Sequence, residues 1–136
     1  MIHLDERAWA AIERVNAEVN ADIRYRTDPE LYGKPDFWTV VEGQGQGDCD
    51  DYALTKRARL IAAGFDHACL RPALCYTETR EAHLVLTVDT DRGTFILDNR
   101  HAAVLPYDAL LGKYEFLARQ APGKFEWVWI EQPANR

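Results

Sequence analysis

The hydrophobic periodicity of this chain changes at Gly64, and this change is the strongest constraint on its fold. Before Gly64, apolar residues recur at helical spacing in two segments: residues 4–20, and a helix that should begin near Asp48 and stop at Gly64. After it, short apolar runs alternate with turn residues, as they do in β-strands. Helices followed by mainly adjacent strands are typical of an α+β fold.

Three strands are predicted directly after this point. The first, residues 68–77, contains Pro72, which favours a sheet edge or a bulge because proline has no N–H for the strand ladder. The next two, residues 82–89 and 94–97, flank a turn at residues 90–93 and should pair as a hairpin.

Proline and glycine positions and the spacing of apolar residues give the predictions for the rest of the chain. Proline and glycine recur through residues 27–47, which predicts an irregular loop, and residues 106–118 are read as a short helix. A last strand is expected at residues 124–131, where Trp127 and Trp129 alternate and should cover one face of the sheet.

Composition places the chain among ordinary globular domains. It has 136 residues, 47% of them hydrophobic and 28% charged, so we expect a single domain over residues 1–136. The net charge of −6 argues against nucleic-acid binding and against a basic membrane-surface helix. No run reaches the ~20 apolar residues of a membrane span. The N-terminus is not a signal peptide, so we expect a cytoplasmic protein, or a periplasmic one if a leader was removed. The oligomeric state is not readable.

The three cysteines, Cys49, Cys69 and Cys75, are an odd number without zinc spacing. Cys69 and Cys75 fall in the first predicted strand and should fill core. Cys49 stands where a glycine-rich loop meets a helix N-terminus, in the segment Gly47–Tyr52. The positive end of the helix stabilises a thiolate, the nucleophilic form of cysteine. The alternative is an incidental cysteine among capping acids.

A cysteine nucleophile needs a base, and the base needs an orienting acceptor. If the hairpin turns at residues 90–93, His83 faces residues 98–100, so the hairpin would bring His83 close to Asp98. The alternative for His83 is a structural strand histidine. Three neighbouring residues are expected only as turn or surface residues: Asp89, Asp91 and His101.

Over about residues 36–110 the sequence resembles the bacterial transglutaminase-like cysteine proteinases. The order Cys49, His83, Asp98 matches, with separations of 34 and 15 residues. The resemblance implies a papain-like or transglutaminase-like fold, with helices packed on an antiparallel sheet. It also implies thiol hydrolysis of a peptide bond in a protein or peptide, through an acyl-enzyme, with Cys49 as nucleophile, His83 as base and Asp98 as orienter. The matching blocks are Gly47–Ala53, Lys56-Arg57, Leu60, Ala82–Leu86 and Ile96–Asn99.

The resemblance also implies a calcium site. The adhesin-clipping members of the family bind calcium through the two acids that flank the cysteine, which here are Asp48 and Asp50. The family usually has Glu where this chain has Asp50. Acids beside a thiol raise its pKa by repulsion, and Ca²⁺ readily takes carboxylate oxygens. The alternative is that both are helix-capping and first-turn acids.

Two residues of the glycine-rich loop are candidates for the oxyanion hole beside the backbone N–H of Cys49. Trp38 carries an indole N–H, and Gln46 lies shortly before the nucleophile. Two other functions remain open from the sequence: another acyl transfer on the same fold (transglutamination, deamidation or amidase action), or a non-catalytic calcium-responsive binding module.

Overall fold

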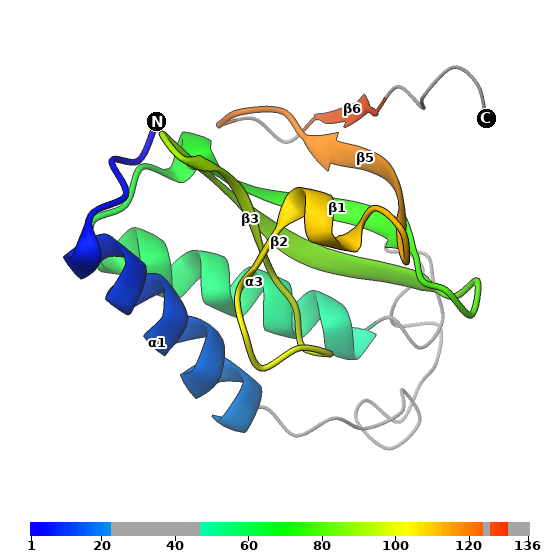
Figure 1. Ribbon diagram of the computed structural model, residues 1–136, viewed down its shortest axis with the longest axis horizontal. Coiled ribbons are helices and arrows are strands. Elements are labelled where there is room, and N and C mark those ends of the chain that lie inside the picture. The colour runs from blue at the N-terminus through cyan, green and yellow to red at the C-terminus, as the bar shows by residue number, and fades with distance from the viewer. Residues whose placement is uncertain (23–46, 124–125, 131–136) are drawn as a thin grey trace.

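The computed structural model of the protein describes residues 1–22, 47–123 and 126–130, and for residues 22 and 47–50 it describes the backbone alone (Figure 1). Two α-helices come first, α1 at Glu6–Asp22 and α3 at Gly47–Ala62. Both confirm the predicted helices to within two residues at their starts. The predicted loop at 27–47 lies outside the described residues, apart from its last residue, which begins α3.

The ends of the helices follow from local chemistry. The carboxylate of Asp5 accepts a hydrogen bond from the backbone N–H of Ala8 at 2.8 Å, which satisfies one free donor of the first turn of α1. Gly64, two residues past α3, has φ of 103°, a conformation that glycine adopts without a steric cost. The helix stop predicted at Gly64 is therefore confirmed.

The helices pack against a six-stranded antiparallel sheet with the order β4-β3-β2-β1-β5-β6. Two short 3₁₀ helices flank its strands: η2 lies between α3 and β1, and η3 lies between β4 and β5. The strands are β1 Leu70–Tyr76, β2 Ala82–Thr90, β3 Gly93–Leu97, β4 Leu105–Pro106, β5 Glu115–Gln120 and β6 Trp127–Trp129, and the 3₁₀ helices are η2 His67–Cys69 and η3 Tyr107–Leu110.

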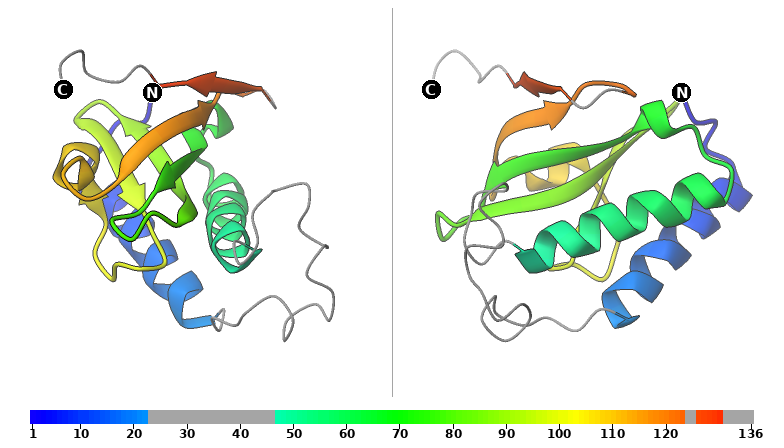
Figure 2. Two further views of the ribbon diagram at one scale, coloured as in Figure 1. Left: turned by 90° about the vertical axis from the view of Figure 1, so that its right-hand side faces the viewer. Right: turned by 180° about the vertical axis from the view of Figure 1, so that it is seen from behind.

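The two faces of the sheet are covered by different elements (Figure 2). Helices α1 and α3 pack on one face, where Ile12, Leu60 and Leu86 belong to the larger cluster of buried apolar residues. The opposite face carries a smaller cluster, which includes Val85 of β2 and Leu110 of η3. Because successive strand residues point to opposite faces, β2 contributes to both clusters and its centre is fully buried. The α+β fold expected from the sequence is confirmed.

Strand β1 differs from its predicted place in the sheet. It lies between β2 and β5 and is not an edge strand. Pro72 pairs with Leu86 of β2, whereas pairing with β5 begins only at Ala73, so at the proline β1 has one neighbour. A register shift does occur, between Leu74 and Cys75. The predicted bulge is therefore present two residues later, and the predicted edge is wrong.

The helix predicted over residues 106–118 is also wrong. Only the single turn of η3 forms there, and residues 115–120 form β5. Tyr107, Leu110 and Tyr114 have the spacing of a helix face, which misleads a local reading. Strand β5 pairs with β1 instead. The pairing gives hydrogen-bond partners to the backbone N–H and C=O groups of β1 on the side away from β2.

Of the last predicted strand, residues 124–131, the described part forms a strand only at Trp127–Trp129, and these tryptophans do not cover the sheet. Trp127 is 50% exposed and Trp129 is 75% exposed, because β6 is the edge strand beyond β5. None of the helices in the described ranges is long and apolar enough to cross a membrane.

Candidate active site

The β2–β3 hairpin brings together the histidine and the aspartate that the sequence pairs. Thr90 pairs with Gly93 across a two-residue turn, and the register runs back to Leu86 opposite Leu97. His83 and Asp98 follow at the open end of the hairpin, where Nε2 of His83 lies 2.7 Å from Oδ1 of Asp98. The proximity of these two residues is confirmed.

Asp98 is the centre of a hydrogen-bond cluster at this end of the sheet. Its side chain is 1% exposed and is contacted by four donors. Oδ1 accepts from His83 and from the backbone N–H of Arg100 at 3.0 Å. Oδ2 accepts from the hydroxyl of Tyr114 at 2.7 Å and contacts Nδ1 of His101 at 3.0 Å. Both oxygens of this buried carboxylate are therefore satisfied.

These contacts decide the ionisation of the cluster. Burial by itself would raise the pKa of Asp98. The hydrogen bond and charge of His83, with the hydrogen bonds from the backbone N–H of Arg100 and the hydroxyl of Tyr114, hold that pKa below its usual range. Burial and the adjacent Asp98 carboxylate raise the pKa of Tyr114 above that of an ordinary tyrosine. Asp98 is thus an anion and Tyr114 a neutral donor at physiological pH.

The ring of His83 is oriented by two contacts. Its side chain is 7% exposed, and Nε2 is committed to Asp98. The edge of the Tyr114 ring meets it with centroids 5.8 Å apart and an interplanar angle of 77°. Among the described residues Nδ1 has no hydrogen-bond partner, so this is the nitrogen available to a nucleophile or substrate.

Helix α1 holds the turn that carries Asp98. The side-chain amide of Asn20 donates to the backbone carbonyl of Asp98 at 3.3 Å, and that of Asn16 donates to Ala102 at 3.1 Å. Asn16 is fully buried. The turn after β3 is therefore fixed to the helical layer as well as to the sheet.

The sequence did not predict two side-chain partners of Asp98, His101 and Tyr114, and its expectation for Asp89 was wrong. His101 was expected as a surface loop residue, but it contacts Asp98; its position three residues after Asp98 is the signal that could have found it. Tyr114 lies in a segment predicted as helix, so no sequence signal places it beside Asp98.

Asp89 is predicted as a turn residue, but it lies in β2. Its carboxylate contacts Thr94, Arg119 and Arg71 at 2.8, 2.9 and 3.3 Å. Asp91 is in the turn, as predicted.

Helix α3 packs against β2 and β1, and its N-terminal end lies at the same end of the sheet as the β1–β2 hairpin (Figures 1 and 2). Its buried positions Tyr52, Ala53 and Leu60 form one stripe. Position 49 precedes Tyr52 by three residues and falls on this stripe by helical spacing. The backbone therefore places Cys49 in the first turn of the helix, near the end of β2 where His83 lies.

Lys56 occupies the same stripe and is the most unusual residue of α3. It is 0% exposed, and its Nζ has no hydrogen-bond partner among the described residues. Nζ lies 5.8 Å from the centre of the Tyr52 ring. Burial lowers the pKa of Lys56 to about 8, against the opposing effect of the Asp98 charge. The ammonium is thus coupled electrostatically to the His83–Asp98 pair.

Several predicted site residues lie outside what the structure describes. The side chains of Cys49, Asp48 and Asp50 are among them, although the three residues themselves lie in the first turn of α3. Trp38 and Gln46 lie outside the described residues altogether. Within the described ranges no group of three or more His, Cys, Asp or Glu residues is arranged to hold a metal ion.

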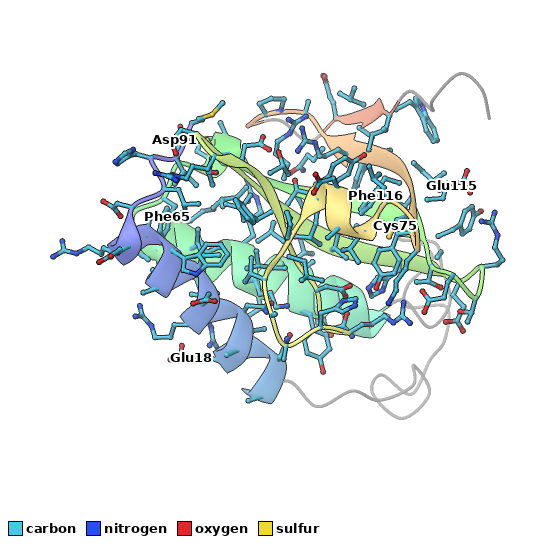
Figure 3. All side chains as sticks on the ribbon, in the orientation of Figure 1. Glu18, Phe65, Cys75, Asp91, Glu115 and Phe116 are labelled. Carbon is cyan, nitrogen blue, oxygen red and sulfur yellow. The ribbon has the colours of Figure 1, made fainter. Side chains whose placement is uncertain are left out.

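The other two cysteines are core residues, as expected. Cys69 is 6% exposed and Cys75 is 0% exposed, and neither is in a disulfide. Cys75 lies in β1 as predicted, whereas Cys69 ends η2 and is not a strand residue. Cys75 lies opposite Phe116 of β5, and both are labelled in Figure 3. Burial leaves neither thiol open to a substrate.

A cavity of about 170 Å³ opens on the face of the sheet opposite the helices, but it does not include the His83–Asp98 pair. Thr87, Thr94 and Arg119 supply its polar groups, with Phe116 on its apolar side. The cavity thus lies further along β2 than the site described here.

Comparison with known proteins points to one family. The sequence profile of the bacterial transglutaminase-like cysteine proteinases (BTLCP) matches residues 1–135. No curated protein sequence matches the chain. Among solved structures, calcium-bound LapG of Legionella pneumophila is 27% identical, with a TM-score of 0.61 over 81% of this chain and 63% of that one. EGTA-treated LapG is 25% identical, with a TM-score of 0.67 over 90% of this chain and 67% of that one.

Proposed function

Because the chain belongs to the bacterial transglutaminase-like cysteine proteinase family, we propose that it is a thiol hydrolase that cleaves peptide bonds in a protein or peptide. The observation that carries the proposal is the buried contact of 2.7 Å between His83 and Asp98. The chain spans 63% of the length of calcium-bound LapG, so the substrate is proposed here only by chemical class.

In this proposal Cys49 is the nucleophile, His83 the base and Asp98 the orienting acceptor. The carboxylate of Asp98 accepts a hydrogen bond from Nε2 of His83, so the proton of the neutral imidazole lies on Nε2. Nδ1 is then the acceptor for the thiol proton. The position of Cys49 at the N-terminus of α3 supports a thiolate, because the helix dipole is positive there.

The reaction proceeds through an acyl-enzyme. The sulfur of Cys49 attacks the substrate carbonyl carbon while Nδ1 of His83 takes the thiol proton. The tetrahedral intermediate expels the amine, which receives that proton from His83, and a thioester remains. Water then attacks the thioester, with its proton going to His83, and the acid product leaves as the thiol is restored.

The oxyanion of both tetrahedral intermediates needs two donors. We assign one to the backbone N–H of Cys49, in the first turn of α3. The second is Trp38 or Gln46 from the segment before the helix. Substituting each residue separately distinguishes them, because loss of one oxyanion donor lowers kcat by about 10²–10³-fold.

The nucleophile is tested by the pH dependence of iodoacetamide labelling, followed at each cysteine by mass spectrometry. We expect the labelling of Cys49 to have a midpoint below the ~8.5 of a free thiol. His83→Asn should raise that midpoint, whereas His67→Asn, at an exposed histidine in η2, should not. A midpoint at or above that of the unfolded chain would contradict the assignment.

Hydrolysis itself is tested with a library of quenched-fluorescence peptides. The wild-type chain should cleave some members, and Cys49→Ala should cleave none. A parallel reaction contains a glutamine peptide and a primary amine. If the amine is incorporated and no peptide is cleaved, the enzyme is an acyl transferase and the hydrolase proposal fails.

We also propose that Asp48 and Asp50 bind Ca²⁺ beside the nucleophile. Their carboxylates suit this cation, and LapG has been solved in calcium-bound and EGTA-treated forms. A bound cation would supply positive charge that offsets the acids around the thiol. Added Ca²⁺ should raise the melting temperature of the wild-type chain but not that of Asp48→Asn/Asp50→Asn. Equal melting temperatures with Ca²⁺ and with EGTA would contradict the site.

A further inference from the structure

A continuous chain of hydrogen bonds runs from the surface of the protein to His83. The carboxylate of Glu78 accepts two bonds from Arg100, at 2.8 and 3.1 Å. Nη1 of Arg100 also donates to the hydroxyl of Tyr114 at 3.0 Å. Tyr114 contacts Oδ2 of Asp98 at 2.7 Å, and Oδ1 of Asp98 contacts His83 at 2.7 Å.

The direction of the middle link is fixed by chemistry. A guanidinium group has donors only, so the hydroxyl oxygen of Tyr114 must accept from Arg100. The hydroxyl has a single proton, and that proton is then free to point only at Asp98. Arg100 in turn is held by the paired bonds to Glu78, a geometry that fixes the plane of the guanidinium.

The links come from three separate segments of the chain. Glu78 lies in the β1–β2 hairpin, Arg100 in the turn after β3, and Tyr114 directly before β5. The guanidinium of Arg100 also lies over the Tyr114 ring, 5.5 Å from its centre. Each segment thus limits the movement of the next, and all three converge on the carboxylate of Asp98.

We propose that Tyr114 is a positioning residue, oriented by Arg100, that holds Oδ2 of Asp98 so that Oδ1 faces His83 and thereby sets the proton affinity of His83. Its importance for catalysis rests on the proposed function, but its effect on His83 does not. A hydroxyl that donates to Asp98 spreads the carboxylate charge and weakens the attraction between Asp98 and a protonated imidazole. Removal of the hydroxyl should therefore make His83 more basic.

Other charged and titratable groups surround His83 and Asp98, and the test must leave these groups unchanged. Lys56 and the position of Cys49 lie on α3, and Cys75 of β1 contacts the backbone carbonyl of His83 at 3.5 Å. His101 contacts the other oxygen of Asp98. None of these is altered when Tyr114 is replaced by phenylalanine, which keeps the ring beside His83.

The test is an NMR titration of the His83 imidazole in the substrate-free chain. We expect Tyr114→Phe to raise the pKa of His83 by about 0.5–1 unit. Tyr107→Phe is the matched control, because the Tyr107 ring packs on Phe116 and its hydroxyl has no bond to Asp98. An unchanged His83 titration in folded Tyr114→Phe would overturn the proposal.

Arg100→Lys tests the orienting role while keeping the charge. It should give part of the Tyr114→Phe shift by itself and no further shift in the double variant, because both act through one hydroxyl. Equal and additive shifts would overturn the role of Arg100. In peptide cleavage, the acidic limb of the kcat/KM profile should move with the NMR value. A shift in the NMR titration without any wild-type cleavage would contradict the proposed function and leave the positioning role standing.

Discussion

His83 and Asp98 are 15 residues apart in the chain, yet Nε2 of one lies 2.7 Å from Oδ1 of the other in the protein interior. The β2–β3 hairpin explains this proximity, because its two-residue turn brings the beginning of β2 to the end of β3. The hairpin places the two residues at the same end of the sheet. The elements around it decide its charge, its hydrogen bonds and its exposure.

Asp98→Asn should lower kcat/KM for peptide cleavage by about 10³–10⁴-fold, the order seen when a catalytic histidine loses its orienting carboxylate. The amide would present a donor to Nε2 and so favour the wrong tautomer of His83. Asp108→Asn in η3 is the control, since Asp108 is exposed and is not among the hydrogen-bond partners that Asp98 has in the described part of the chain. Activity within a factor of ten of wild type would exclude Asp98 as the orienting residue.

The same variant should change the acid stability of the protein. The folded-state pKa of Asp98 lies below its ordinary value of about 4. The carboxylate therefore contributes stability that is present above about pH 4 and is lost as the pH falls towards the folded-state value. The difference in free energy of unfolding between wild type and Asp98→Asn should narrow from pH 5 to pH 2, as measured by urea unfolding. A constant difference would show that the pKa of Asp98 is unshifted.

Lys56→Met should stabilise the protein at pH 7. The folded-state pKa of Lys56 is about 8, below the 10.5 of a free lysine, so protonation favours the unfolded chain below pH 8. This cost, up to about 3 kcal/mol, is relieved as the pH rises from 8 to 10.5. The gain from Lys56→Met should therefore shrink over that interval in chemical unfolding experiments.

Lys113→Met is the control for this prediction, because Lys113 is exposed and its loss should change the free energy of unfolding by less than about 0.5 kcal/mol. If Lys56→Met lowers the free energy of unfolding at pH 7, the ammonium has a favourable partner and the cost assigned to its burial is wrong.

Asp89→Asn should destabilise the protein by about 1–3 kcal/mol without altering His83. Asp89 joins Arg119 and Arg71 of two strands, and its side chain is 19% exposed, so the variant leaves two guanidinium groups without their carboxylate. Urea unfolding measures the loss, and the NMR titration of His83 serves as the internal control. A shifted His83 titration would mean that the two ends of β2 are coupled.

Much of the fold was predictable because it depends on local patterns. The two helices, the β2–β3 hairpin and its turn follow from periodicity and turn residues, and all of them form. The errors occur where a distant segment decides the outcome. Residues 106–118 are predicted as a helix, but residues 115–120 form β5, because they pair with β1. Pro72 suggests an edge or a bulge; a register shift follows between Leu74 and Cys75, but the strand is internal.

The site likewise has a part that the sequence predicts and a part that depends on distant segments. The pairing of His83 with Asp98 depends on the register of one hairpin, and register follows from turn length, which the sequence displays. The register of the hairpin does not determine the other contacts of Asp98, which come from Tyr114, His101 and Arg100. Tyr114 in particular arrives from beyond η3, and no periodicity relates it to the hairpin. The roles of Cys49, Asp48, Asp50, Trp38 and Gln46 remain predictions for the experiments above.

The sequence by itself determined the helix–strand order, the hairpin that pairs His83 with Asp98, and the cysteine at the start of a helix. These are short-range features, set by periodicity, capping and turn chemistry. Only the tertiary structure decided that Asp98 is buried under Tyr114 and His101, and that Lys56 is an enclosed ammonium near it. Burial and electrostatic coupling depend on which distant segments exclude water from a site, and that is a property of the packed molecule alone.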